Sequence, residues 1–412
     1  MKNNASQTRP ATVPIRLERK PGRISVGGFS LIEMMVAITL GLLLTAGMIQ
    51  LFDSTKVTFR SNDALARVQE NGRFTLELLK REFRHLGADG FCAGRLNIRN
   101  HLDRSGSSFD DAVFDAGRAV TGWEFDGTGR SDSYTIPDDL SDGTGNWDST
   151  DGTLPDAILD RAAPGSDVVI IRWSEPIPGI TADSSSPPAN ANAIPLTGGH
   201  TLPDDAIVMV TNCASGADVF QNRSNANAST LSKGLGSGND PGNLNSGCTT
   251  GGTTSGCDWT TNYDESMQIM LQRSAAYFIG LTDRLDRDGE PIPALYELDL
   301  TSGEGDPARE LVVGVENMQV LYGFSRPPPA GDGQSVNDWL TASEMPNVDG
   351  WGQVIAVQLS FLIRSQERAD GDNTAVGYVL ADTDITAPGD GRFRQPFSTT
   401  IALRNRVLVF DG

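Results

Sequence analysis

The chain is short of the residues from which catalytic and metal sites are usually built. Its 412 residues include only three histidines and four cysteines, and no two cysteines have the Cys-x-x-Cys spacing common in zinc sites. It contains no Gly-x-Ser-x-Gly nucleophile motif, no Gly-x-x-x-x-Gly-Lys-Ser/Thr phosphate loop and no His-Glu-x-x-His motif. The sequence therefore predicts that the protein is not an enzyme and has no cofactor or metal site.

Basic residues are also scarce. Lysine and arginine total 33 against 53 acidic residues, giving a formal net charge of −20. Phosphate backbones are bound through lysine and arginine patches, so we expect no direct contact with nucleic acid. The acids at Asp283–Glu290 do not have the alternating ligand spacing of a calcium loop, and we interpret Asp288-Gly289 as a hairpin turn.

Long apolar runs are missing except at one place. Phe29–Phe52 is 24 residues long and has Glu33 as its only charge, and this length is enough to cross a hydrocarbon core of about 30 Å. The segment 1–28 before it carries six lysines and arginines against one glutamate. The positive-inside rule places this leader in the cytoplasm and the rest of the chain outside the membrane.

No proline occurs between Phe29 and Leu86. The apolar half, 29–52, is followed by an amphipathic half, 53–86, so one long helix is expected. Gly87 follows a basic last turn and marks the expected helix end. Apolar or small residues recur at three- and four-residue steps on one face: Leu65, Val68, Gly72, Leu76, Leu79, Phe83 and Leu86.

The remainder, 87–412, is expected to be a β-rich globular domain. Strands are predicted at 167–173, 206–211, 275–279, 295–299, 311–315, 318–322, 354–363 and 399–403. In 354–363 the bulkier alternate residues, Ile355, Val357, Leu359 and Phe361, are expected to face the core. Few helices separate these strands, which indicates an antiparallel sheet packed on the helix, an α+β fold. Loop insertions are expected near 100–160 and 225–260.

The four cysteines are Cys92, Cys213, Cys248 and Cys257. An even number of cysteines in an exported domain indicates disulfides, and three pairings are possible. We favour Cys248–Cys257, which closes a short loop, with Cys92–Cys213 tying the end of the helix to the domain. The short loop alone could contribute about 2–3 kcal/mol through loop-closure entropy.

The junction Gly28-Phe29-Ser30-Leu31-Ile32-Glu33 resembles the processing site of type IV pilins and type II secretion pseudopilins. The resemblance implies that a prepilin peptidase cuts between Gly28 and Phe29 and that the new amino terminus of Phe29 is methylated. It also implies that Glu33 guides assembly into a filament, through pairing with an amino-terminal ammonium. The net charge would fall from −20 to −25 once the +5 leader is lost.

Further segments resemble the PilW-type minor pilins: 69–74, 205–221, 311–323 and 397–406. The resemblance implies a pilin-like fold and an inner-membrane protein with one span and a periplasmic domain that later enters a pilus. It implies that other minor and major pilins and the inner-membrane assembly platform are partners. The expected function is priming of pilus assembly, in support of twitching motility, adhesion or DNA uptake.

Two alternatives stay open. A minor pseudopilin of a type II secretion system would carry the same kind of leader. A membrane-tethered adhesin or receptor would instead bind a ligand through the loops at 100–160 and 225–260. Loss of twitching on deletion would indicate the pilus, and loss of exoprotein release would indicate the secretion system.

Overall fold

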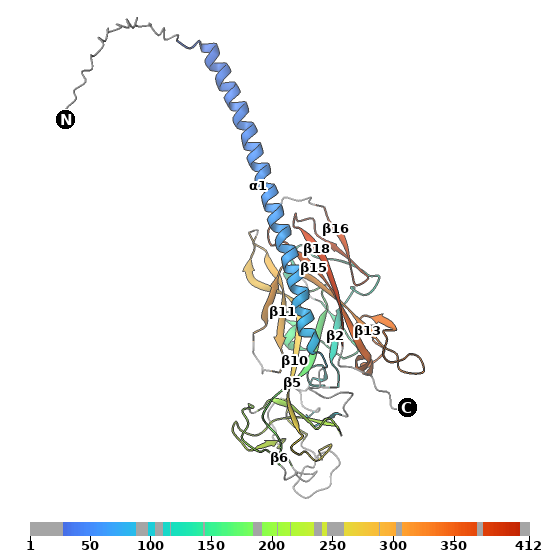
Figure 1. The fold of residues 1–412 in the computed structure, drawn as a ribbon. Helices are drawn as coiled ribbons and strands as arrows, with labels where there is room; N and C mark the ends of the chain where they lie inside the picture. Colours follow the sequence, from blue (N-terminus) through green and yellow to red (C-terminus); the bar gives the residue numbers. More distant parts are fainter. Residues whose placement is uncertain are drawn as a thin grey trace, which may run out of the picture. The chain divides into compact units, whose positions relative to one another are not determined.

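The computed structural model describes residues 28–87, 98–103, 110–115, 117–142, 145–183, 192–203, 205–214, 216–234, 241–244, 259–287, 289–301, 307–368 and 374–403. The leader up to residue 27 therefore lies outside the described residues, as do Cys92, Cys248 and Cys257. The chain divides into two compact units, Met1–Lys56 and Val57–Gly412. The class is α+β, with one long amino-terminal helix and a large domain of β-sheets (Figure 1).

Helix α1 covers Leu31–Glu82, and a 3-10 turn, η1, continues it over Phe83–His85. The expected helix end at Gly87 is confirmed. Gly87 has a φ of +61°, a conformation that favours glycine. Its N–H donates to the carbonyl of Arg172 at 3.1 Å, so the end of the helical segment is bonded to a strand of the domain.

Within the second unit, α1 packs one face on the domain, as its amphipathic pattern predicts. Its fully buried residues are Val68, Gly72, Thr75 and Leu79, and Phe83 and Leu86 after it are each 1% exposed. Leu65 was expected on the same face but is 39% exposed. The first fully buried residue of α1 is Val68, so this packing begins one turn later than the sequence pattern predicts.

Gly72 allows a close approach between α1 and the strand that contains Phe397. A Cβ atom built on Gly72 would lie 2.2–2.5 Å from three atoms of the Phe397 ring. One position away, Asn71 Nδ2 donates to the carbonyl of Val313 at 3.0 Å. The helix is thus fixed to two strands that are more than 80 residues apart in the sequence.

Replacing Gly72 with alanine should destabilise the domain. The added methyl group overlaps the Phe397 ring, and such overpacking typically costs about 1–3 kcal/mol. Gly47→Ala is the matched control, because no atom lies within 4 Å of a Cβ at Gly47 in the same helix. Thermal unfolding in detergent should show a lower Tm for Gly72→Ala only; equal Tm values for the two variants would contradict this packing.

The largest sheet is built around the long strand β10, Gln268–Leu285. Strand β5, Val168–Pro176, pairs along one edge of β10. On the other edge β7, Ile207–Thr211, pairs first, and β11, Pro291–Asp299, pairs further along. Beyond β7 the sheet continues with β8, Ala217–Gln221, and ends at β1, Ile98–Asn100. Beyond β5 it continues with β2, Val120–Phe125, and ends at β4, Trp147–Asp148. Strand β11 also pairs with β12, Arg309–Val313.

A second sheet has the order β14-β13-β15-β18, with bounds Asp338–Leu340, Val315–Phe324, Val354–Arg364 and Arg394–Ala402. Val357, Leu359 and Phe361 of β15 are fully buried in the main core, as predicted. Ile355 is only half-buried, and Val354 is buried in its place. The cause is a register shift between Gly323 and Phe324, whose partners are Ala356 and Val354, so Ile355 has no opposite residue.

The strand predictions between residues 167 and 403 fall on observed strands. The segment predicted at 311–315 is divided at Gly314, whose φ is +82°, between the end of β12 and the start of β13. A hairpin turn was predicted at Asp288-Gly289; Asp288 lies outside the described residues, and Gly289, between β10 and β11, has a φ of +89°. The amide of Asp286 donates to the carbonyl of Glu290 at 2.8 Å to close this turn.

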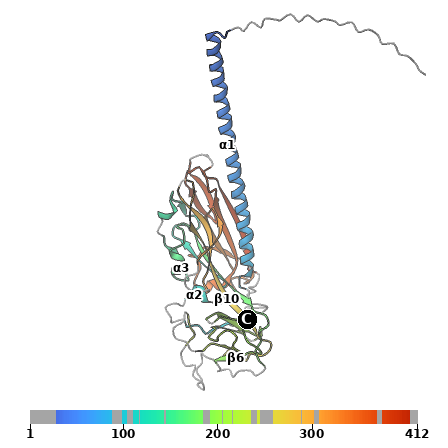
Figure 2. The same cartoon turned by 90° about the vertical axis from the view of Figure 1, so that its left-hand side faces the viewer.

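The segment 100–160, expected to be mainly loop, contains one inner strand. All six residues of β2 are buried, and β2 pairs with β5. The other elements there are short: α2, Asp111–Phe114; β3, Ser133–Thr135; η2, Leu140–Asp142; and α3, Asp156–Leu159. Figure 2 shows α3 and the second half of α1 on opposite sides of the sheets.

Two small sheets and one further turn complete the described domain. Strands β16, Val376–Leu380, and β17, Thr383–Ala387, join β3. Strands β6, Ala193–Pro195, and β9, Thr230–Ser232, form a pair at one end of the second unit in both views. A separate apolar core lies there around Phe220, Trp259 and Tyr263.

The further turn lies before β15, where the chain forms the 3-10 turn η3, Val348–Gln353.

Candidate processing and assembly site

The predicted cleavage site lies in a short non-helical segment just before α1. A Cβ placed on Gly28 would have no atom within 4 Å, and Phe29 is 81% exposed. The first hydrogen bond at the helix start runs from the amide of Met34 to the carbonyl of Ser30, at 3.1 Å. A peptidase needs an accessible, unfolded peptide bond, and the Gly28–Phe29 bond meets this requirement. The cleavage and the methylation of Phe29 stay predictions.

Glu33 lies in the first turn of α1. Unpaired backbone N–H groups at a helix start carry partial positive charge, which favours a carboxylate at this position. Phe29 precedes Glu33 by four residues, so cleavage after Gly28 would place a new ammonium group close to this carboxylate in sequence. Opposite charges attract more strongly when the surrounding dielectric constant is low.

The described part of the first unit, residues 28–56, exposes an apolar surface. Side chains such as Leu31, Leu43 and Phe52 are 79%, 69% and 69% exposed. The helix is long and apolar enough to cross a membrane. Thr39, Thr45 and Thr55 donate their hydroxyl hydrogens to carbonyls three or four residues earlier, at 2.8–2.9 Å. Such a surface requires lipid or other apolar helices around it.

The sequence analysis missed a buried group of charges at the ends of β13, β15 and β18, which we call the arginine cluster: Asp286, Glu316, Arg364, Asp390, Arg392 and Arg394. The Glu316 carboxylate accepts hydrogen bonds from Arg394, at 2.6 and 2.9 Å, and from Arg364, at 3.2 Å. Arg394 also donates to Asp390 at 2.7 and 2.8 Å. Arg392 joins Asp390 to Asp286. Three positive and three negative charges therefore balance one another.

Electrostatics keep the Asp390 carboxylate of this cluster ionised over a wide pH range. Burial opposes the charge on Asp390, but hydrogen bonds and charges from Arg394 and Arg392 outweigh it and hold the pKa of Asp390 well below its usual value. A carboxylate whose pKa is lower in the folded than in the unfolded state stabilises the fold above the unfolded pKa of about 3.9. The stabilisation of the fold by ionised Asp390 is lost only as the pH falls through the lower pKa of the folded state, so it is intact at neutral pH.

Glu316→Gln should be strongly destabilising. It leaves Arg364 and Arg394 buried, with side chains 6% and 3% exposed, beside a neutral partner. Breaking a buried pair in this way typically costs about 3–5 kcal/mol. Glu310→Gln is the control, because its partner Arg284 is 57% exposed and surface pairs contribute about 0–1 kcal/mol. Urea unfolding should show a much larger loss of unfolding free energy for Glu316→Gln than for Glu310→Gln. A similar loss of unfolding free energy in both variants would mean that the cluster is not a stabilising unit.

A second buried polar group lies beside the separate apolar core around Phe220, Trp259 and Tyr263. His101 Nε2 lies 2.6 Å from Asp218 Oδ1, and Tyr263 donates to Asp218 Oδ2 at 2.5 Å. Thr260 donates its amide and its hydroxyl to the same carboxylate. Asp218 is fully buried. The carboxylate beside His101 is thus already saturated with donors, which fits a structural role.

Cys213 is disulfide-bonded. Its backbone has a φ of +59°, just after β7. The other three cysteines lie outside the described residues, so both pairings, Cys92–Cys213 and Cys248–Cys257, stay predictions. No group of three or more metal-ligating side chains occurs within the described ranges.

Comparison with known proteins bears on the carboxyl-terminal third. Residues 276–405 match the family model of type IV pilus-assembly protein W, PilW. The chain is PilW-like. The match begins within β10 and ends just after β18, and it contains every residue of the arginine cluster. No curated protein and no solved structure matches the chain.

Two of the four segments that resemble PilW in sequence, 311–323 and 397–406, overlap this matched region. A third, 69–74, lies on α1 outside it and contacts both of them, because Asn71 bonds to Val313 and Gly72 meets Phe397. The PilW-like region therefore forms part of the surface on which the amphipathic half of α1 packs. This packing connects the domain to the helix that carries Glu33.

Proposed function

We propose that the protein is a minor pilin of a type IV pilus. It is inserted in the inner membrane as a prepilin, with its domain in the periplasm, and the prepilin peptidase removes residues 1–28. The helix 29–52 then leaves lipid and packs among the helices of other minor and major pilins on the assembly platform. The role is structural rather than enzymatic: the protein primes pilus assembly and thereby supports twitching motility, adhesion or DNA uptake.

One observation carries this proposal. A PilW-like β domain packs on the second half of a helix whose first half is exposed, apolar and charged only at Glu33. A buried charge in lipid costs about 2.5–3.5 kcal/mol on insertion scales. In a helix that only anchors a protein, the charge would destabilise insertion without any compensating contact. In a helix that moves into a bundle of other helices, the charge can form an ion pair at one defined position.

Deletion in the native host tests the proposal. The deletion strain should lose twitching and surface pili while its exoprotein release is unchanged, and the full-length gene should restore both. Loss of exoprotein release with normal pili would instead indicate a minor pseudopilin. A deletion strain with normal pili and normal secretion would contradict an assembly role altogether.

A further inference from the structure

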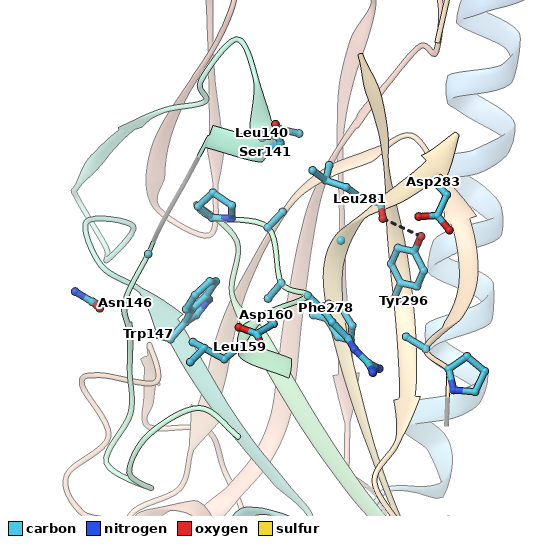
Figure 3. Close-up of a pocket in the computed structure, with 18 residues that line it drawn as sticks. Leu140, Ser141, Asn146, Trp147, Leu159, Asp160, Phe278, Leu281, Asp283 and Tyr296 are labelled. Atoms are coloured by element: carbon cyan, nitrogen blue, oxygen red, sulfur yellow. Dashed lines mark hydrogen bonds between the residues drawn. The ribbon is translucent and has the colours of Figure 1, made fainter. Parts of the chain in front are cut away.

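A pocket of about 860 Å³ opens on the face of the large sheet that is turned away from α1. Figure 3 shows its two walls. Trp147, Leu159 and Asp160 stand on one side, and Leu281, Asp283 and Tyr296 stand on the other. The volume lies within the usual range of about 300–1,000 Å³ for small-molecule sites.

Alternation along the strands explains the position of this pocket. Tyr277 and Ile279 of β10 pack in the main core with α1, whereas Phe278 points to the opposite face, where it stacks on Tyr296 with ring centres 5.8 Å apart. Gly280, the next residue on that face, has no side chain. A Cβ there would come within 3.0 Å of the Arg161 carbonyl and of the Tyr296 ring. The small residue keeps the floor of the pocket open.

The lining combines apolar surface with polar groups that are free to bind a ligand. Leu159 is 42% exposed, and Tyr296 is half-buried. Four polar side chains line the same space and have no hydrogen bond or ion pair to other described residues: Asn146, Asp160, Arg161 and Asp283. The other described arginines of the domain, by contrast, are largely engaged, for example Arg118, Arg309 and Arg326.

We propose that this pocket binds a short neutral saccharide. A sugar ring has apolar C–H faces and a rim of hydroxyl groups that both donate and accept hydrogen bonds. Leu159 and Tyr296 supply surface for the ring faces. Asp160 and Asp283 accept hydrogen bonds, Arg161 donates, and the amide of Asn146 does both. One positive charge beside two negative charges disfavours phosphorylated and acidic ligands, and the exposed polar rim disfavours a lipid chain.

Only one of the two walls lies in the part of the chain that matches the PilW family model. Residues 278–308 of the lining lie inside the matched region, whereas residues 140–164 lie outside it. A binding site with one framework wall and one wall made of connecting segments is a common way to place specificity on a shared scaffold. No residue of α1 lines the pocket, so a ligand bound there would not contact the helix.

The experiment measures sugar binding by the full chain in a detergent that has no sugar headgroup. Saturation-transfer NMR is run with lactose, cellobiose and N,N′-diacetylchitobiose. At least one should bind with a Kd below about 10 mM. Asp160→Ala should raise this Kd about tenfold or more through loss of charged hydrogen bonds, and Leu159→Ala should raise it severalfold through loss of apolar contact.

Matched controls lie outside the pocket. Asp126→Ala removes an exposed acid and Leu285→Ala removes an apolar side chain that is 62% exposed; neither should change the Kd by more than about twofold. Thermal unfolding confirms that each variant is folded. The proposal is overturned if none of the three sugars binds, if the pocket and control variants behave alike, or if the peptide Ala-Lys-Leu-Ala displaces the sugar and binds more tightly.

Discussion

Gly28→Ala should leave the protein as an uncut precursor that still reaches the membrane. The substitution should not disturb folding, because a Cβ at Gly28 meets no atom within 4 Å, and we expect it to act on peptidase recognition instead. In the proposed topology the uncut chain would keep its +5 leader in the cytoplasm, and a charged segment would not follow the helix into a bundle of apolar helices. Surface pili should therefore fall to the level of the deletion strain.

Immunoblots and intact mass of membrane-extracted protein measure this effect. Gly47→Ala serves as the control, because it makes the same chemical change at an equally open position of α1 and should be processed normally. Mature protein of normal size in the Gly28→Ala strain would show that the cut lies elsewhere.

Glu33→Ala should separate membrane insertion from assembly. Removal of the charge makes the helix easier to place in lipid, by about 2.5–3.5 kcal/mol if Glu33 is ionised there, so the amount of processed protein in the membrane should be unchanged or higher. Incorporation into pili should drop by at least about tenfold, because an ammonium group in the bundle loses its partner and an unpaired buried charge is costly.

The readout is the ratio of this protein in sheared pili to that in the inner membrane. Glu33→Asp keeps the charge on a shorter side chain and should give an intermediate ratio. Glu70→Ala removes an exposed glutamate from the same helix and should behave as wild type. A normal ratio for Glu33→Ala would refute the pairing role of this residue.

Local sequence patterns were enough to predict α1 and the principal strands. The helix end needed only a glycine after a basic turn, and Gly87 has the positive φ that this implies. Strand β15 could be predicted from its alternation, but the side chain of Ile355 could not, because a bulge opposite Gly323 and Phe324 shifts the register. Such a shift depends on the partner strand and has no local signal.

Buried strand β2 was missed for a similar reason. It includes Gly122 in a segment rich in Asp, Gly and Ser, and glycine is unfavourable in a strand unless another group approaches closely. The structure supplies that group, because a Cβ at Gly122 would lie 1.7 Å from the Tyr322 hydroxyl oxygen. Tyr322 is 200 residues away, so the reason for the glycine exists only in the fold.

The arginine cluster and the pocket were likewise beyond local reasoning. Glu316 and Arg394 are 78 residues apart, and the walls of the pocket come from segments on either side of residue 200. One signal was present for the cluster: Glu316 is the only charged residue of β13, a strand that is fully buried. A buried acid needs a cationic partner, and the arginines at alternate positions 392 and 394 were candidates for that partner.

The amino-terminal residue and the intact mass of the protein extracted from native membranes test the central claim most directly. We predict a chain that begins at N-methylated Phe29 and continues through the apolar helix to the end of the sequence. A chain that still begins at Met1, or one cut after residue 52 so that the helix is lost, would contradict the account.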